Sequence, residues 1–303
     1  MNDSLAAPTA SPQDTGYQEM RWPLRHLTMA GVHWPAESRA PGRPPIVMLH
    51  GWLDNCLSFR RLAPELAAVT DVYALDMAGH GHSGHRPAGQ GYLLADYVAD
   101  LAEVLDSGFE GPVDLVGHSL GGIVCMLYAS AFPEKVRRLA VIDSLGPLTK
   151  SSGEAVSQLR RGILKRLAGS GSSAGYRTQE EAATARAGGL SPLSPEAAAQ
   201  LVGRNLRQTD QGFEWRTDPR LRHPSMMMYN DDQAMAFLKA IEAPTLLVRA
   251  EGGLLGTRER WQSRLEAVPR LTEVSVAGSH HCHLDGDTRP VADAVGEFLS
   301  EQG

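Results

Sequence analysis

One serine of this chain stands in a run of small residues that could make it a nucleophile. Residues 117–122 read Gly-His-Ser-Leu-Gly-Gly and fit the G-x-S-x-G pattern around Ser119. In that pattern the serine lies on a sharp strand-to-helix turn, and glycines keep the two backbones free of side-chain clashes. An apolar run at 113–116 precedes the turn, and an apolar stretch of helical character follows at 123–129. We therefore predict a nucleophile elbow rather than an ordinary glycine-rich turn.

A serine hydroxyl is a poor nucleophile at neutral pH, so it needs a nearby base and a third group that orients this base. Three histidines, His280, His281 and His283, lie close together after an apolar run near the C-terminal end. Their place after the serine favours one of them as the base. Metal binding and capping of the next helix by His283 are the alternatives. The loop spacing lacks the i, i+4 geometry of helical metal ligands.

Strands alternate with helices along most of the chain. Apolar runs predict strands at 45–50, 71–76, 113–116, 138–143, 244–250 and 271–277, and short alternating segments predict an antiparallel pair within 17–36. Helices are expected at 59–67, 92–105, 257–267 and 291–299. This alternation predicts an α/β fold, in which a mostly parallel sheet is covered by helices on both faces.

Residues 144–240 break this rhythm. They contain Ser/Gly clusters, Ala-rich helical patches and three methionines at 226–228, but no convincing buried strand. We predict a mostly helical cap whose interior the methionines fill, with the lining of an apolar substrate pocket as the alternative. The chain then divides into a flexible tail (1–16), a first core segment (17–143), the cap (144–240) and a second core segment (241–303).

Bulk composition gives no support to several classes of function. The 303 residues carry a net charge of −6, which gives no electrostatic footprint for nucleic acid or for an anionic membrane surface. No run of 18 apolar residues predicts a transmembrane span, and the first residues do not resemble a signal peptide. Three widely spaced cysteines favour reduced thiols, and hence a cytoplasmic location. The oligomeric state stays open.

Further motifs carry a resemblance to a known family. His50-Gly51-Trp52 follows the third predicted strand, the run Asp-Met-Ala-Gly-His-Gly-His-Ser at 76–83 follows the fourth, and Phe132-Pro133 follows the elbow helix. Together with the elbow and the histidine loop, they make the chain resemble the α/β-hydrolases over nearly its whole length. Residues 50–55, 117–122 and 280–285 are similar to the serine hydrolase-like subgroup. The resemblance implies an eight-stranded sheet.

The resemblance also implies roles for individual residues. The family places its base at the first histidine of a G-H-x-x-H-L-[DE] loop, which selects His280 and leaves His281 as the runner-up, although Ser279 replaces the usual glycine. The backbone N–H groups of Trp52 and Leu120 would form the oxyanion hole, where two preorganised donors stabilise the developing negative charge.

The third member of the triad departs from the family pattern. Where the usual G-x-x-D motif has its aspartate, this chain has Gly253. Two candidates remain for the acid. Asp143 ends the strand after the elbow helix, a position that certain haloalkane dehalogenases use, and Glu251 lies two residues before the usual site. We favour Asp143.

These observations predict a carboxylesterase-like serine hydrolase that needs no metal or organic cofactor and cleaves a small, fairly apolar ester. Hydrolysis of a C–C bond, an amide or a thioester would use the same triad, since the fold does not set the substrate. Serine at the elbow, instead of aspartate, argues against haloalkane dehalogenases and epoxide hydrolases. A weakly catalytic ligand-binding protein on the same fold is the alternative from another class, and Gly253 is the feature that keeps it open.

Overall fold

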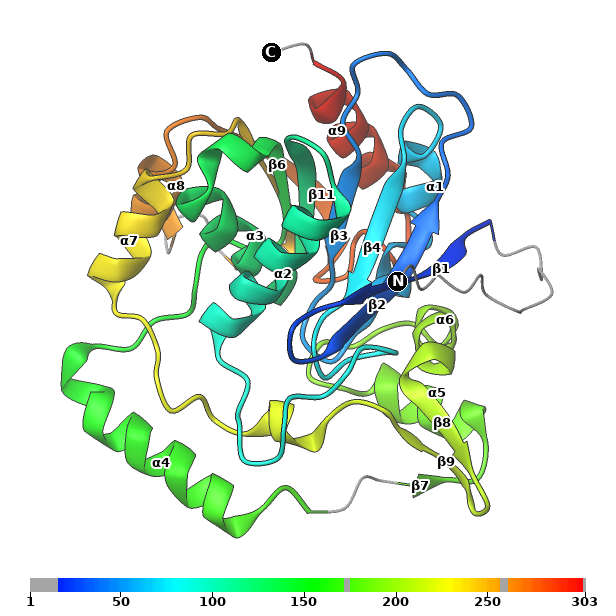
Figure 1. Ribbon diagram of the computed structural model, residues 1–303, viewed down its shortest axis with the longest axis vertical. Coiled ribbons are helices and arrows are strands. Elements are labelled where there is room, and N and C mark those ends of the chain that lie inside the picture. The colour runs from blue at the N-terminus through cyan, green and yellow to red at the C-terminus, as the bar shows by residue number, and fades with distance from the viewer. Residues whose placement is uncertain (1–15, 172–174, 257–260, 302–303) are drawn as a thin grey trace, which may run out of the picture.

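The computed structural model describes residues 16–171, 175–256 and 261–301, and within them eight strands form one twisted sheet (Figure 1). The strands follow the spatial order β1 (Gln18–Pro23), β2 (Thr28–Trp34), β4 (Val72–Asp76), β3 (Ile46–Leu49), β5 (Val113–His118), β6 (Val136–Ile142), β10 (Thr245–Gly252) and β11 (Leu271–Ser279). β2 pairs antiparallel with β1 and β4, and the other neighbours are parallel. The predicted α/β class is confirmed.

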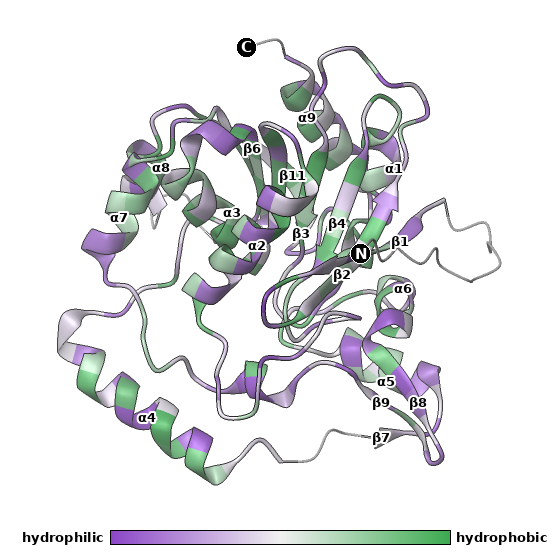
Figure 2. Cartoon of the chain, in the orientation of Figure 1, coloured by the Kyte–Doolittle hydropathy of each residue, from purple (hydrophilic) through white to green (hydrophobic). Residues whose placement is uncertain are grey.

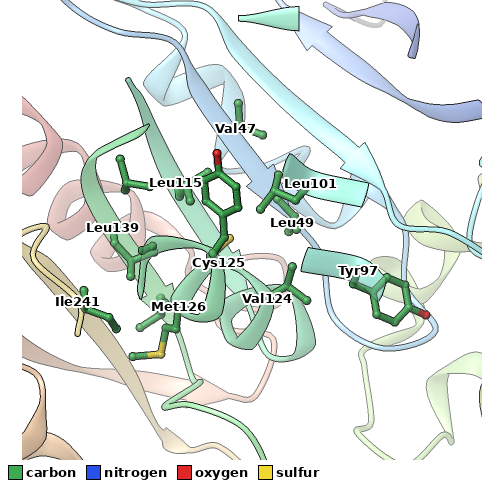
Figure 3. Close-up of a cluster of buried hydrophobic side chains, with 14 of the residues drawn as sticks. Val47, Leu49, Tyr97, Leu101, Leu115, Val124, Cys125, Met126, Leu139 and Ile241 are labelled. Carbon is green, nitrogen blue, oxygen red and sulfur yellow. The ribbon is translucent and has the colours of Figure 1, made fainter. Parts of the chain in front are cut away.

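Alternating side chains give the sheet an apolar core on each face. In β3, Val47 and Leu49 belong to one core and Ile46 and Met48 to the other. The first core is covered by α2 (Leu94–Gly108), α3 (Leu120–Ala131), α7 (Asp231–Lys239) and α8 (Gln262–Ala267). The second is covered by α1 (Ala63–Leu66) and α9 (Arg289–Ser300). Figure 3 shows α3 packed into the first core, and this packing fixes the helix that follows Ser119.

Between β6 and α7 the chain leaves the main sheet, in a segment that lies within the predicted cap (144–240) and is called the cap below. It contains α4 (Ala155–Ala168), α5 (Gln179–Ala187), α6 (Pro195–Asn205) and a small antiparallel sheet of β7 (Gly175–Tyr176), β9 (Gly212–Trp215) and β8 (Leu206–Thr209). The sequence pattern did not predict this sheet, because its strands are two to four residues long and mostly not buried. They therefore carry no buried apolar run.

Some local expectations need correction. The single helix expected at 59–67 is instead a 3₁₀ turn (Cys56–Phe59) followed by the one-turn α1. Pro64 lies in the first turn of α1 and has no backbone N–H, so it cannot form the hydrogen bond that would join the two into one helix. Nearly all of the predicted tail, and residues 257–260 of the predicted helix at 257–267, lie outside the described residues.

The described residues also bear on the expectations about membrane spans and cysteines. No helix among them is both long enough and apolar enough to cross a bilayer. The thiols of Cys56, Cys125 and Cys282 are buried and free of disulfides.

Candidate active site

Ser119 occupies a strained turn between β5 and α3. Its backbone has φ 51° and ψ −117°, a conformation that non-glycine residues rarely adopt. The neighbouring glycines explain how the turn fits: a Cβ on Gly117 would lie 2.5 Å from the Cα of Gly122, and one on Gly121 would lie 2.0 Å from the carbonyl oxygen of Leu49. The serine is therefore held at a sharp bend by close contact between strand and helix.

His280 comes directly after β11 and meets Asp143, which comes directly after β6. The Nδ1–H of the imidazole donates to Oδ2 of Asp143 at 2.6 Å, and both side chains are buried. The backbone N–H of Leu254 donates to the same carboxylate oxygen at 2.7 Å. A carboxylate in this position fixes the ring orientation and leaves Nε2 of His280 as the nitrogen that can exchange a proton with a substrate or a nucleophile.

Gly253 makes room for this contact. A Cβ at Gly253 would lie 2.4 Å from both carboxylate oxygens of Asp143. The side chain that the family pattern expects at 253 would thus collide with the carboxylate that comes from β6. Glu251, the other candidate acid, is exposed near the end of β10, and the structure brings Asp143, not Glu251, to His280.

His281, the runner-up base, belongs to a separate buried ion pair. Its Nε2–H donates to Oδ2 of Asp54 at 3.0 Å, and Arg186 of the cap donates to the other oxygen of Asp54 at 2.8 Å. Although burial raises the pKa of the Asp54 carboxyl, His281 and Arg186 outweigh burial and hold it well below its usual range. The carboxylate is therefore charged, and it binds the core to helix α5.

Two of these residues also belong to a group of candidate ligands for a metal ion. Within the described part of the chain, Asp54, His118 and His281 form a buried group whose ligand atoms all lie within 4.8 Å of one another. Burial and the neighbouring imidazoles hold the pKa of His118 well below its usual value, so this ring is neutral. However, Arg186 already neutralises the negative charge of Asp54, and the Nε2–H of His281 donates a hydrogen bond to the same carboxylate. A cation would have to displace both, so these residues fit a hydrogen-bonded ion pair better than a metal site.

The strained serine, the histidine–aspartate pair and the parallel sheet agree with comparisons against known proteins. A family model described as alpha/beta hydrolase fold matches residues 44–287. The chain belongs to this family. The hydrolase is 29% identical over 311 residues to a serine hydrolase-like protein of Danio rerio, covering 99% of this chain and 93% of that one. It is 31% identical over 284 residues to a probable serine hydrolase of Drosophila melanogaster, covering 86% and 82%. The crystal structure of a hypothetical protein from Pseudomonas aeruginosa PAO1 matches with a TM-score of 0.87 at 39% identity, covering 93% of this chain and 99% of that one.

A cavity of about 360 Å³ is lined by several candidate residues of this hydrolase. Ser119, His280 and Trp52 line it, and Arg186 and Arg222 of the cap add cationic groups to its wall. Trp52 follows β3, and Leu120 is the first residue of α3, where a backbone N–H has no partner inside the helix. The N–H of Gly121 donates to the carbonyl oxygen of His50 at 3.0 Å, which holds the start of α3 against the turn that carries Trp52.

Trp52 also lines a second cavity of about 410 Å³, whose other lining residues are mostly apolar. Leu120, Ile123, Met227 and Met228 are among the residues that line it. The prediction that the methionines fill the interior of the cap is therefore wrong for Met227 and Met228. They come from an extended segment between the last 3₁₀ turn of the cap (Pro219–Arg222) and α7, and they face a cavity instead of a packed core.

The sequence analysis missed the contributions of the cap to the site. Arg186 and Arg222 carry no motif, and they are far in sequence from Ser119 and His280. Their place in the cavity wall depends on how the cap packs on the core. For Arg186, that packing is fixed by the ion pair with Asp54.

Proposed function

We propose that this hydrolase cleaves the carboxylic ester of a small, fairly apolar substrate through an acyl-enzyme on Ser119. The observation that carries the proposal is the 2.6 Å contact between Nδ1 of His280 and Asp143, together with the place of His280 in the same cavity wall as a serine on a strained elbow. An oriented imidazole and a serine held at a sharp turn are the two components that acyl transfer requires.

In the proposed mechanism, Oγ of Ser119 attacks the carbonyl carbon while Nε2 of His280 takes its proton. Asp143 holds the ring and stabilises the imidazolium. The N–H groups of Trp52 and Leu120 donate to the oxyanion. The imidazolium then gives its proton to the leaving alkoxide, and the ester bond breaks. A water molecule attacks the acyl-enzyme with His280 as base, and the acid leaves Ser119 with its proton restored.

The second, apolar cavity is the proposed place for the acyl chain. Leu120 lines this cavity and lies beside the nucleophile in the sequence. An acyl group on Ser119 would therefore extend along α3 toward Ile123 and Met228. The cavity for the leaving alcohol is then the more polar one, which contains Arg186 and Arg222.

Replacement of the nucleophile tests the proposal. In Ser119→Ala, hydrolysis of short 4-nitrophenyl esters should fall about 10⁶-fold, as expected when a serine nucleophile is lost, and a fluorophosphonate probe should no longer label the protein. Ser130→Ala, at the far end of the same helix, is the matched control and should keep both properties.

Two results would contradict the proposal. Turnover retained in Ser119→Ala would remove the serine from the mechanism. Slow labelling of the unmodified protein would favour the ligand-binding alternative. The same assay with matched thioesters and anilides separates ester hydrolysis from its nearest rivals.

A further inference from the structure

Helix α4 of the cap extends away from the body of the molecule (Figure 1). Of its residues, Gln158 and Gly162 are buried, and the remaining residues are exposed. Both buried residues rest on the segment that leads to α7. The side-chain amide of Gln158 donates to the carbonyl oxygen of Ser225, and Gly162 packs against Met226 so closely that a Cβ would lie 2.6 Å from its side chain. One narrow face thus attaches the helix.

Another face of α4 carries a row of aliphatic side chains that are exposed to solvent. Val156, Leu159, Ile163 and Leu167 follow the spacing that places residues on one side of a helix, and Val156 and Leu167 are 80% and 78% exposed. Figure 2 shows these apolar bands along the helix, between hydrophilic ones. A row of this kind normally packs against a core, and contiguous exposed apolar surface marks an interaction site.

The same helix is basic. It contains Arg160, Arg161, Lys165 and Arg166 and no acidic residue, in a chain whose net charge is −6. All four cations are exposed. Lysine and arginine beside an aliphatic stripe are typical of helices that lie in the surface of an anionic bilayer.

The apolar row continues toward the apolar cavity. Met227 follows the residue on which α4 rests and is 74% exposed, and Leu148, which precedes the helix, is also exposed. Both side chains line the second cavity. A surface covering α4 would therefore also cover an apolar passage into the molecule.

We propose that α4, together with Leu148 and Met227, docks on an anionic lipid surface. Charge favours this occupant over a second copy of the chain, because a twofold pairing of α4 with itself would bring two sets of four cations together. The composition of the stripe also favours lipid. It is aliphatic throughout and lacks the tryptophan and tyrosine that dominate the energetics of protein interfaces.

Vesicle binding tests the proposal on the intact protein. Co-sedimentation with vesicles of phosphatidylcholine and phosphatidylglycerol should exceed that with phosphatidylcholine alone, and 0.5 M salt should weaken it, since salt screens exposed charges. Neutralising two cations, in Arg160→Gln/Lys165→Gln, should lower the partition coefficient about thirtyfold. Ile163→Ser/Leu167→Ser should abolish sedimentation.

Val69→Ser is the matched control, because Val69 is also an exposed aliphatic residue but lies on the core beyond α1. This variant should bind like the unmodified protein. Circular dichroism checks that each variant is folded. The measurement needs no turnover, so its failure is distinct from a failure of the proposed ester hydrolysis.

Three outcomes would overturn the proposal. The first is that the unmodified protein does not bind anionic vesicles, and the second is that the α4 variants bind them as well as the unmodified protein does. The third is a dimer in light scattering that Ile163→Ser/Leu167→Ser dissociates, while neither the unmodified protein nor any variant binds vesicles. The last result would assign the α4 face to a second copy of the chain.

Discussion

At the scale of single residues, Asp143 and Gly253 explain each other. The carboxylate of Asp143 occupies space that a side chain at position 253 would need, because a Cβ there would lie 2.4 Å from both carboxylate oxygens. A chain that takes its acid from the end of β6 must therefore keep the later position free. The absence of an aspartate at 253, which seen alone argues for a degenerate site, is the condition for the contact between Asp143 and His280.

The choice between the two candidate acids is testable by substitution. Asp143→Asn removes the charge and lets the amide favour the wrong imidazole tautomer, so we expect kcat for a 4-nitrophenyl ester to fall about 10⁴-fold. Glu251→Gln, at an exposed position, should leave kcat within a factor of about two, by the small effect expected of surface substitutions. The reverse ranking of the two variants in steady-state kinetics would assign the acid to Glu251.

At the scale of elements, α3 connects the nucleophile to the apolar cavity. The helix starts directly after Ser119, and Leu120 and Ile123 both line the cavity because residues three apart share one face of a helix. The buried side chains of α3, among them Val124, Cys125 and Met126, hold it on the first core (Figure 3). The position of the cavity relative to the serine is thus fixed by one rigid element.

A bulky side chain on α3 should shorten the acyl chains that the protein accepts. In Ile123→Trp, the indole would fill part of the second cavity, so kcat/KM for an octanoyl ester should fall at least about tenfold more than for an acetyl ester, by the few kcal/mol that one or more misfitting methylenes are worth. Ile123→Val is the control and should keep the chain-length profile. An equal loss on both esters would place the acyl chain elsewhere.

At the scale of the whole molecule, buried ion pairs fasten the cap to the core. Arg186 of α5 donates to Asp54 at 2.8 Å, and Arg204 of α6 donates to Asp76 at 2.7 Å. Burial raises the pKa of both carboxyls, but their partners outweigh burial and hold each pKa below the usual value of 3.8. These partners are His281 and Arg186 for Asp54, and Arg204 with backbone N–H donors for Asp76. Each carboxyl therefore takes up a proton more readily in the unfolded chain than in the folded one.

The stability of the protein should consequently fall in acid. A lowered pKa stabilises the folded state fully above about pH 4 and loses this effect as the pH falls toward the folded-state pKa. We expect the free energy of unfolding in urea to decrease from pH 5 to pH 3. Asp54→Asn should lose about 3 kcal/mol at pH 7, as when one partner of a buried pair is removed, and should depend less on pH in acid.

Glu181→Gln is the control for this measurement. It breaks an exposed ion pair with Arg177 at the start of α5, so it should leave the free energy of unfolding nearly unchanged. An Asp54→Asn variant as stable as the control at pH 7 would contradict the role of the buried pair.

The amino-acid sequence by itself determined the α/β class, the elbow around Ser119 and the importance of the histidine loop, because these features depend on residues close together in the chain. Apolar periodicity is a local signal, and so is a run of glycines around a serine. The contact of Asp143 with His280 and the ion pairs of Arg186 and Arg204 join residues that are 128 to 137 positions apart. The two cavities that Trp52 lines join segments that are still farther apart in the sequence. They were decided by how the strands are ordered and how the cap packs on the core. In the sequence, α4 has the pattern of an ordinary amphipathic helix, because periodicity shows only that a helix has an apolar face. Tertiary packing alone decides whether the rest of the protein covers that face.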